Sequence, residues 1–132
     1  MTHHKHAVRT ESAPAPFQGA PYSQGVVSGD LVFVSGQLGI DPAKGQVVEG
    51  GIGPQTEQVM KNLAAILGEA GASLDDVVMT SIFLIDLQDF QAMNEAYSGH
   101  LTEPYPARAT VQIAALPSGA RIEIAVVARR SR

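Results

Sequence analysis

Two side chains in the C-terminal part of the chain have the types and spacing of a small site for carboxylic acids. Arg108 stands in EPYPARATVQIAALP, residues 103–117, at the start of a run typical of a β-strand. A guanidinium has paired donors that match the two oxygens of a carboxylate. Thr110 follows two residues later, so both side chains leave one face of the strand about 7 Å apart. Glu123 lies in the last expected strand, where partial burial would raise its pKa toward that of a general base.

The same residues also fit a purely structural role. A salt bridge between Arg108 and Glu123 would fix neighbouring strands without binding any ligand. Residue spacing does not separate a salt bridge from a carboxylate receptor, so on these residues alone both hypotheses stay open.

The composition restricts the other kinds of chemistry. The chain has 132 residues, of which 45% are hydrophobic, enough for one packed domain. It contains no cysteine, which excludes disulfides, thiolate metal sites and a cysteine nucleophile. The net charge of −4 disfavours binding to nucleic acid. His100 is the one histidine beyond the N-terminal segment and has no adjacent acid or nucleophile in the sequence, which disfavours a Ser-His-Asp triad.

The N-terminal segment differs from the rest of the chain. Residues 1–16 are polar and then rich in Pro and Ala, which predicts a mobile tail before a single domain over 17–132. Its His3, His4 and His6 lack a partner carboxylate or cysteine, so we expect no specific metal site. No apolar run approaches the roughly 20 residues that span a bilayer, and the first dozen residues lack a secretory apolar centre. We therefore expect a cytoplasmic protein without a membrane partner.

The elements that must position Arg108 and Glu123 follow from hydrophobic periodicity and turn residues. A hairpin with its turn at 28–30 comes first, and two helices follow, one between Pro54 and Gly71 and one after Asp86. We expect strands at 24–27, 31–35, 46–48, 77–85, 109–114 and 122–128. Two helices on one face of a mixed, mostly antiparallel sheet make a two-layer α+β sandwich.

The second face of this sheet requires a cover. Two helices cover only one side, yet the last strand carries apolar side chains on both: Ile122, Ile124 and Val126 on one, Ala125 and Val127 on the other. A large exposed apolar patch is unusual on a soluble monomer, so we expect another copy of the chain to cover it. Glu123 then falls on the side of the contact between copies.

Four ordered segments resemble the RidA/YjgF/UK114 family of reactive-intermediate deaminases, formerly called L-PSP endoribonucleases. They are APYSQ at 20–24, LVFVSGQLGIDPAKG at 31–45, SLDDVVMTSIFLIDLQDFQAMNEAY at 73–97 and YPARATVQIAALPSGARIEIAVVA at 105–128. The resemblance extends from about residue 13 to residue 129. It implies a chorismate-mutase-like fold assembled as a homotrimeric barrel, with active sites in the clefts between subunits.

The resemblance also implies an activity. Members hydrolyse reactive 2-imino acids such as 2-iminopropanoate and 2-iminobutanoate, and the enamines in equilibrium with them, to 2-keto acids and ammonia without a cofactor. It assigns the carboxylate clamp to Arg108 and the holding or activation of water to Glu123. Thr110 stands where many members have cysteine, which removes thiol-dependent regulation at this position. The substrate pocket that the resemblance implies is lined by Tyr22, Ser35, Gly36, Asn94, Arg108 and Thr110.

Two other functions stay open beside the deaminase. One is a non-catalytic trimeric ligand-binding or chaperone-like protein, and the other is an endoribonuclease, after the older family name. The presence of both Arg108 and Glu123 favours the enzyme, since some relatives lack the arginine. The acidic net charge and the lack of a catalytic histidine near Arg108 disfavour the ribonuclease.

Overall fold

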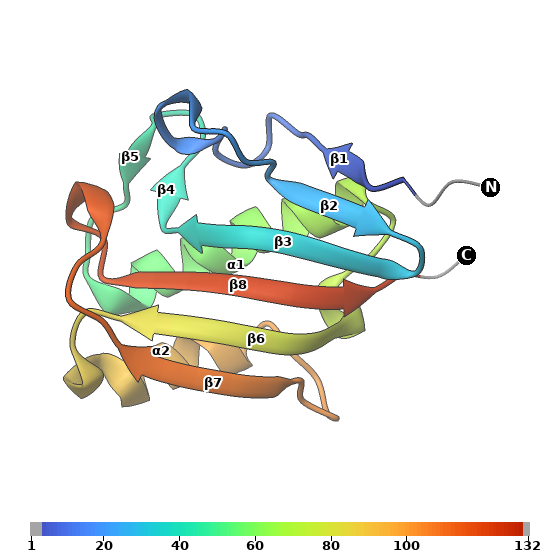
Figure 1. Ribbon diagram of the computed structural model, residues 1–132. Helices are drawn as coiled ribbons and strands as arrows, with labels where there is room; N and C mark the ends of the chain where they lie inside the picture. The colour runs from blue at the N-terminus through green and yellow to red at the C-terminus, as the bar shows by residue number, and fades with distance from the viewer. Residues whose placement is uncertain (1–3, 131–132) are drawn as a thin grey trace.

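A six-stranded sheet carries both α-helices on one face (Figure 1). The computed structural model describes residues 4–130. The helices are α1 (Ile52–Glu69) and α2 (Phe90–Ser98). The strands are β1 (His6–Val8), β2 (Gly25–Ser28), β3 (Leu31–Leu38), β4 (Ile40–Asp41), β5 (Gln46–Val47), β6 (Val77–Leu84), β7 (Ala107–Gln112) and β8 (Ile122–Arg129). This arrangement confirms the predicted two-layer α+β class.

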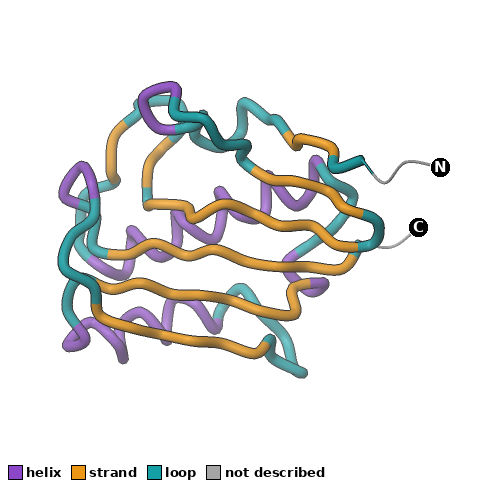
Figure 2. The backbone as a smooth tube through the Cα atoms, viewed as in Figure 1, coloured by secondary structure: helices purple, strands orange, loops and turns teal. Residues whose placement is uncertain are grey.

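The strand order separates the candidate residues between an edge and the centre of the sheet. The order is β1-β2-β3-β8-β6-β7, and β4 and β5 form a separate small hairpin. All neighbours in the large sheet are antiparallel except β6 and β7, which run parallel because α2 connects them as a crossover (Figure 2). Arg108 is therefore carried by an edge strand and Glu123 by a central one.

Alternating side chains give the sheet one fully buried face. In β8, Ile122, Ile124, Val126 and Ala128 are buried beneath the helices, while the residues between them are half-buried. In β6, Thr80, Ile82 and Leu84 pair with this buried set through the strand register. The period of two thus assigns each residue of these strands to the helix-covered face or to the open face.

Helix α1 supplies most of the core. The predicted apolar stripe is confirmed, since Val59, Leu63, Ile66 and Leu67 are fully buried against the sheet. Asn62 lies within this buried stripe and donates to the backbone carbonyls of Leu38 and Ile40, at 3.1 and 2.9 Å. These bonds attach the helix to the end of β3, where the chain turns toward the small hairpin.

The strands differ from those expected in their ends, in the longer β3, which reaches Leu38, and in β4, which was not predicted. Two further differences concern the N-terminal segment and the site. Strand β1 forms within the segment that showed no strand periodicity, because His6 to Val8 pair with β2. The mobility predicted for residues 1–16 stays a prediction, and His3 lies outside the described residues. Strand β7 begins at Ala107 rather than Ala109, so Arg108 lies inside the strand, opposite Thr80 of β6.

The face of the sheet opposite the helices is open in the single chain (Figure 1). Phe33 of β3 and Val111 of β7 are exposed there, at 43% and 46%. This agrees with the expectation that two helices cover one face only. Within the described residues, no helix combines the length and apolarity needed to cross a membrane.

Candidate functional site

The guanidinium of Arg108 lies against helix α2. Because Arg108 pairs with the buried Thr80, its side chain leaves the helix-covered face of the sheet. Its Nη1 donates to Asn94 Oδ1 at 2.7 Å. Its Cζ lies 5.4 Å from the ring centroid of Phe90 and 5.3 Å from that of Tyr97. Both distances are within the range of cation–π contacts. We call these three α2 residues, Phe90, Asn94 and Tyr97, the guanidinium cradle.

Helix periodicity explains why the cradle residues meet one side chain. Positions 90, 94 and 97 are spaced by four and three residues, so they share one face of α2. Tyr97 is only 5% exposed, and its hydroxyl hydrogen-bonds Thr80 Oγ1 at 3.0 Å. Since Thr80 is also the strand partner of Arg108, the helix and the arginine are fixed by the same residue of β6.

A fork of hydrogen bonds holds the start of α2. Arg121 Nε and Nη2 donate to the two carboxylate oxygens of Asp89, at 3.0 and 2.9 Å. The backbone N–H of Arg121 donates to Gln55 Oε1 at 2.8 Å, which connects the fork to α1. A bidentate arginine–carboxylate pair has a defined geometry, so the fork fixes the position of the neighbouring Phe90.

Tyr97 presents a neutral ring to Arg108. Burial raises the pKa of Tyr97, against smaller opposite effects of the Thr80 hydrogen bond and the Arg108 charge. The phenol therefore stays protonated at neutral pH. The contact with Arg108 is thus one of a cation with a ring face rather than an ion pair.

A cavity of about 340 Å³ opens beside the guanidinium. It is lined by Asn94, Tyr97, Ser98, Tyr105, Pro106 and Arg108. Asn94 occupies one guanidinium N–H, and a guanidinium has five, so donors remain for a carboxylate. On the same face of β7, Thr110 Oγ1 is buried and has no hydrogen-bond partner among residues 4–130. A buried hydroxyl without a partner is available to a ligand or a water molecule.

Glu123 lies in a different environment. It is flanked in the sheet by Leu38 of β3 and Phe83 of β6. No hydrogen bond or ion pair joins its carboxylate to another residue within 4–130, and burial raises its pKa. The backbone of Gly36 passes so close that a Cβ there would lie 2.5 Å from Glu123 Oε2. The carboxylate thus occupies space that any other residue at position 36 would fill.

Ser35 and Tyr22 belong to the Glu123 side of the molecule. The Ser35 N–H donates to the carbonyl of Gln24 at 2.9 Å, and its hydroxyl donates to the carbonyl of Ser23. Strand β3 therefore connects Gly36 to the segment that carries Tyr22. The Tyr22 hydroxyl accepts the backbone N–H of Phe17 at 2.6 Å.

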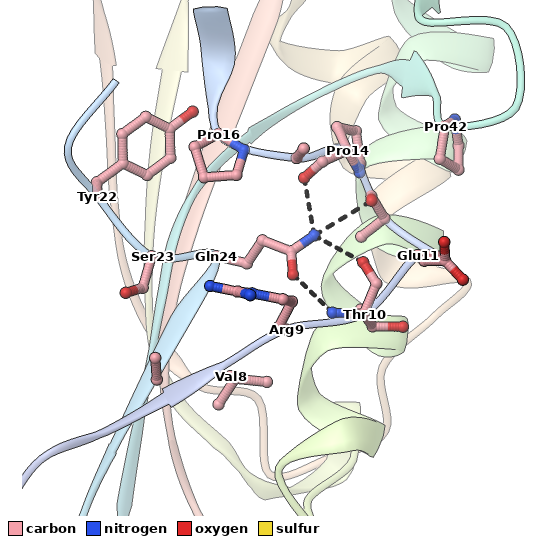
Figure 3. Close-up of a pocket in the computed structure, with 13 residues that line it drawn as sticks. Val8, Arg9, Thr10, Glu11, Pro14, Pro16, Tyr22, Ser23, Gln24 and Pro42 are labelled. Carbon is pink, nitrogen blue, oxygen red and sulfur yellow. Dashed lines mark hydrogen bonds between the residues drawn. The ribbon is translucent and has the colours of Figure 1, made fainter. Parts of the chain in front are cut away.

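Gln24 fastens the N-terminal segment beside Tyr22, as Figure 3 shows. Its amide nitrogen donates to the carbonyls of Thr10, Ala13 and Pro14 at 2.9 to 3.1 Å, and its oxygen accepts the N–H of Thr10 at 2.8 Å. Gln24 is only 3% exposed. A cavity of about 590 Å³ lies along this segment, but neither Arg108 nor Glu123 lines it, so we do not place the reacting groups there.

The predicted site residues thus form two groups on opposite faces of one chain. Arg108, Thr110 and Asn94 lie on the helix-covered face, whereas Glu123 with Gly36 and Ser35 belongs to the other group. The register decides this, because Arg108 pairs with the buried Thr80 while Glu123 pairs with Phe83 on the open face. The hypothesis of a salt bridge between Arg108 and Glu123 is therefore wrong within the chain.

The sequence profile of Endoribonuclease L-PSP matches residues 10–130, nearly the whole chain. The chain belongs to this family, known also as RidA/YjgF. A human relative named 2-iminobutanoate/2-iminopropanoate deaminase is 44% identical over 117 residues, which cover 89% of this chain and 85% of the relative.

Solved structures of the RidA/YjgF family have the same fold. RidA from the Antarctic bacterium Psychrobacter sp. is 46% identical and superposes with a TM-score of 0.90, over 94% of this chain and 98% of that one. TdcF of E. coli with bound serine is 36% identical, with a TM-score of 0.87 over 96% of this chain and 99% of that one. Members at this level of similarity therefore include proteins named as imine deaminases and one solved with an amino acid bound.

Two cradle residues of this RidA/YjgF chain were not among the candidates from sequence. Phe90 and Tyr97 fit the apolar face of α2, and their periodicity alone is typical of core residues. The available signal was their spacing from Asn94, which places all three on one helical face. The side chain that they face comes from another strand, and periodicity within the helix does not identify it.

Proposed function

We propose that this protein hydrolyses reactive 2-imino acids to 2-keto acids and ammonia. The observation that carries the proposal is the guanidinium of Arg108, held beside a 340 Å³ cavity with donors free for a carboxylate. The desolvated Glu123 supplies the second group. Relatives named as 2-iminobutanoate/2-iminopropanoate deaminases, among them the human protein, support this reaction class.

In the proposed reaction, Arg108 holds the carboxylate of the 2-imino acid and so fixes the position of C2. The substrate reacts as the iminium, protonated on nitrogen. Glu123 accepts a proton from water while the water oxygen bonds to C2 and the C=N π electrons move to nitrogen and neutralise it. The resulting carbinolamine receives a proton on nitrogen from Glu123. The Glu123 carboxylate then takes the hydroxyl proton as the C–N bond breaks, which gives the 2-keto acid and ammonia, and this proton passes to the ammonia as ammonium. The iminium carbon is already electrophilic, so positioned water suffices.

The opposite placement of the two groups supports a site shared between copies. One chain cannot bring the guanidinium of Arg108 and the carboxylate of Glu123 to the same small substrate, because the sheet lies between them. A second copy on the open face, where Phe33 and Val111 are exposed, would supply the missing group. We propose a homotrimer with one such site at each contact between subunits.

The activity is tested by generating 2-aminoacrylate or 2-aminocrotonate in situ with a dehydratase and following its decay. The wild type should accelerate the decay, and Arg108→Ala should lose most of this acceleration. A wild type without any effect on the decay would refute the deaminase. A wild type that binds 2-ketobutyrate yet leaves the decay unchanged would be the non-catalytic ligand-binding protein instead, and cleavage of RNA would indicate the ribonuclease.

The shared site is tested by mixing two inactive chains. Arg108→Ala and Glu123→Gln chains are unfolded together, refolded at equal amounts and compared with each variant refolded alone. In a randomly mixed cyclic trimer, about one quarter of the sites would combine an intact arginine with an intact glutamate from the neighbour. Recovery of about that fraction of wild-type activity is expected. No recovery, in mixed oligomers verified by mass, would contradict a shared site.

A further inference from the structure

Phe90 is an exposed aromatic residue that the core of the fold does not explain. It is 41% exposed and lies outside the cluster of buried hydrophobic residues. Its ring centroid nevertheless lies 5.4 Å from Arg108 Cζ. Tyr97 contributes a second ring to the same guanidinium, at 5.3 Å. Tyr97 belongs to the buried core, so Phe90 is the ring that packing does not explain.

The cradle leaves the arginine little freedom to move. Asn94 accepts one N–H of the guanidinium, and the two rings contact it without using any donor. A free arginine side chain loses rotamer entropy when it is ordered. A cradle that orders Arg108 in advance removes part of this cost from substrate binding.

We infer that Phe90 and Tyr97 are positioning residues for carboxylate binding, acting through Arg108. The inference rests on the proposed function, because it assumes that the ligand of Arg108 is the carboxylate of a 2-imino or 2-keto acid. Neither ring takes part in the attack of water on C2. Their removal should therefore raise KM and leave kcat near that of the wild type.

Phe90 is the better residue for the test, because it is exposed and its substitution spares the core. Phe90→Leu keeps an apolar side chain but removes the ring face, and we expect KM to rise about three- to fivefold, as for the loss of one cation–π contact at a partly exposed site. Phe90→Tyr keeps a ring face and should restore the wild-type KM. Leu87→Ala, at an exposed apolar position just before α2, is the matched control and should change neither constant.

Tyr97 requires a more conservative change because it is buried. Tyr97→Phe keeps the ring and removes only the hydrogen bond to Thr80 Oγ1. We expect a smaller rise in KM than for Phe90→Leu, since the ring stays beside Arg108. A thermal melt of each variant establishes that it is folded before its kinetics are compared.

A double-mutant cycle separates positioning from general packing. In the Arg108→Ala background, Phe90→Leu should have no further effect on binding of 2-ketobutyrate, measured by calorimetry, because the side chain through which it acts is gone. An unchanged KM in Phe90→Leu, with active wild type, would overturn the inference while the deaminase stands. An effect of equal size with and without Arg108 would also overturn it. A wild type that neither reacts nor binds would instead refute the proposed function.

Discussion

The two halves of the candidate site are built in opposite ways. The guanidinium of Arg108 is exposed and is held by three side chains of α2, two of them aromatic. The carboxylate of Glu123 is half-buried between apolar strand neighbours, and no described residue within 4–130 hydrogen-bonds it. The charge of Arg108 is held by side-chain contacts, whereas that of Glu123 has no such contact among the described residues and is partly removed from solvent.

The difference matches the two tasks that the proposed reaction sets. A guanidinium that binds a carboxylate must stay charged and keep a fixed orientation. The two neighbouring rings and the amide oxygen stabilise the charge and fix the orientation. A base that accepts a proton from water is more effective when its pKa lies closer to the working pH, and burial provides that shift. Within one chain the two environments lie on opposite faces of the sheet, and in the proposed oligomer each comes from a different copy.

Substituting Glu123 tests the desolvated half and should have the largest effect. Glu123→Gln removes the base, so kcat should fall about 10²- to 10⁴-fold. In the wild type, kcat/KM should fall as the pH drops through the raised pKa of Glu123. Glu69→Gln, at an exposed carboxylate, is the matched control.

The same variant should gain stability at neutral pH. The folded state holds the Glu123 proton at pH values where the unfolded state has lost it, so the native protein loses stability as pH rises from the unfolded toward the folded pKa. Glu123→Gln avoids this loss, and its gain in Tm should shrink as the pH falls toward 4. A variant less stable than wild type at pH 7 would contradict the desolvated carboxylate.

Substituting Arg108 by lysine tests the supported half. Arg108→Lys keeps the charge but loses the planar fork, and kcat/KM should fall about 10- to 100-fold, the equivalent of a charge-assisted hydrogen bond. Arg121→Lys is the comparison, because it alters the other arginine fork, with Asp89, and should lower Tm through α2. A kcat/KM equal to that of the wild type in Arg108→Lys would contradict a role for the planar, paired donors of the guanidinium, because an ammonium point charge would then bind the carboxylate equally well.

Gln24 tests how the Glu123 side is held in place. Gln24→Leu removes the four hydrogen bonds that fasten residues 10–14 and should lower the free energy of unfolding by about 2–4 kcal/mol. Gln46→Leu, at an exposed amide, should have little effect. Binding of 2-ketobutyrate by the folded variant should change less than its stability, because Gln24 lies near the β1–β2 edge of the sheet and the cradle at the β7 edge. Chemical denaturation and calorimetry measure the two quantities.

Thr110 should show the smallest effect. Its hydroxyl is buried without a partner, so Thr110→Val should change the free energy of unfolding by no more than about 1 kcal/mol, in the stabilising direction. If the hydroxyl serves a ligand beside Arg108, affinity for 2-ketobutyrate should fall a few-fold, and Thr110→Ser should retain it. A marked destabilisation in Thr110→Val would mean that the hydroxyl has a partner in the fold.

Local signals predicted the elements well. The end of α1 before Gly71 is confirmed. The predicted start at Pro54 is wrong, because α1 begins at Ile52 with Gly51 as its N-cap, and Pro54 lies in the first turn. The apolar stripe of α1 defined the core face, because helical periodicity depends on residues close in sequence.

Strand β1 escaped prediction because three residues show no usable period. The conformation of β1 is set by its pairing with β2 and by the hydrogen bond of Gln24 to Thr10, just after the strand. These two residues are 14 positions apart in the sequence, so no local pattern reports the contact.

The arrangement of the site depended on long-range register. Parity within each strand correctly grouped Arg108 with Thr110 and set Glu123 apart from its apolar neighbours. Parity could not show whether Arg108 and Glu123 leave the same face of the sheet. Strand β6 lies between β7 and β8, and its register with each of them decides this. The guanidinium cradle could not be predicted for the same reason. Which side chain a helix face contacts depends on a strand that is distant in sequence.

Gly36 shows how one missing side chain controls a second residue. The irregularity in β3 between Val34 and Gln37 brings its backbone against the carboxylate of Glu123. A side chain at position 36 would therefore require the Glu123 carboxylate to move from the place it has here. In a chain of this fold, the final-strand glutamate takes the position seen here only where the residue at the irregularity in β3 leaves it room. The conformation of one side chain is thus set by the absence of another.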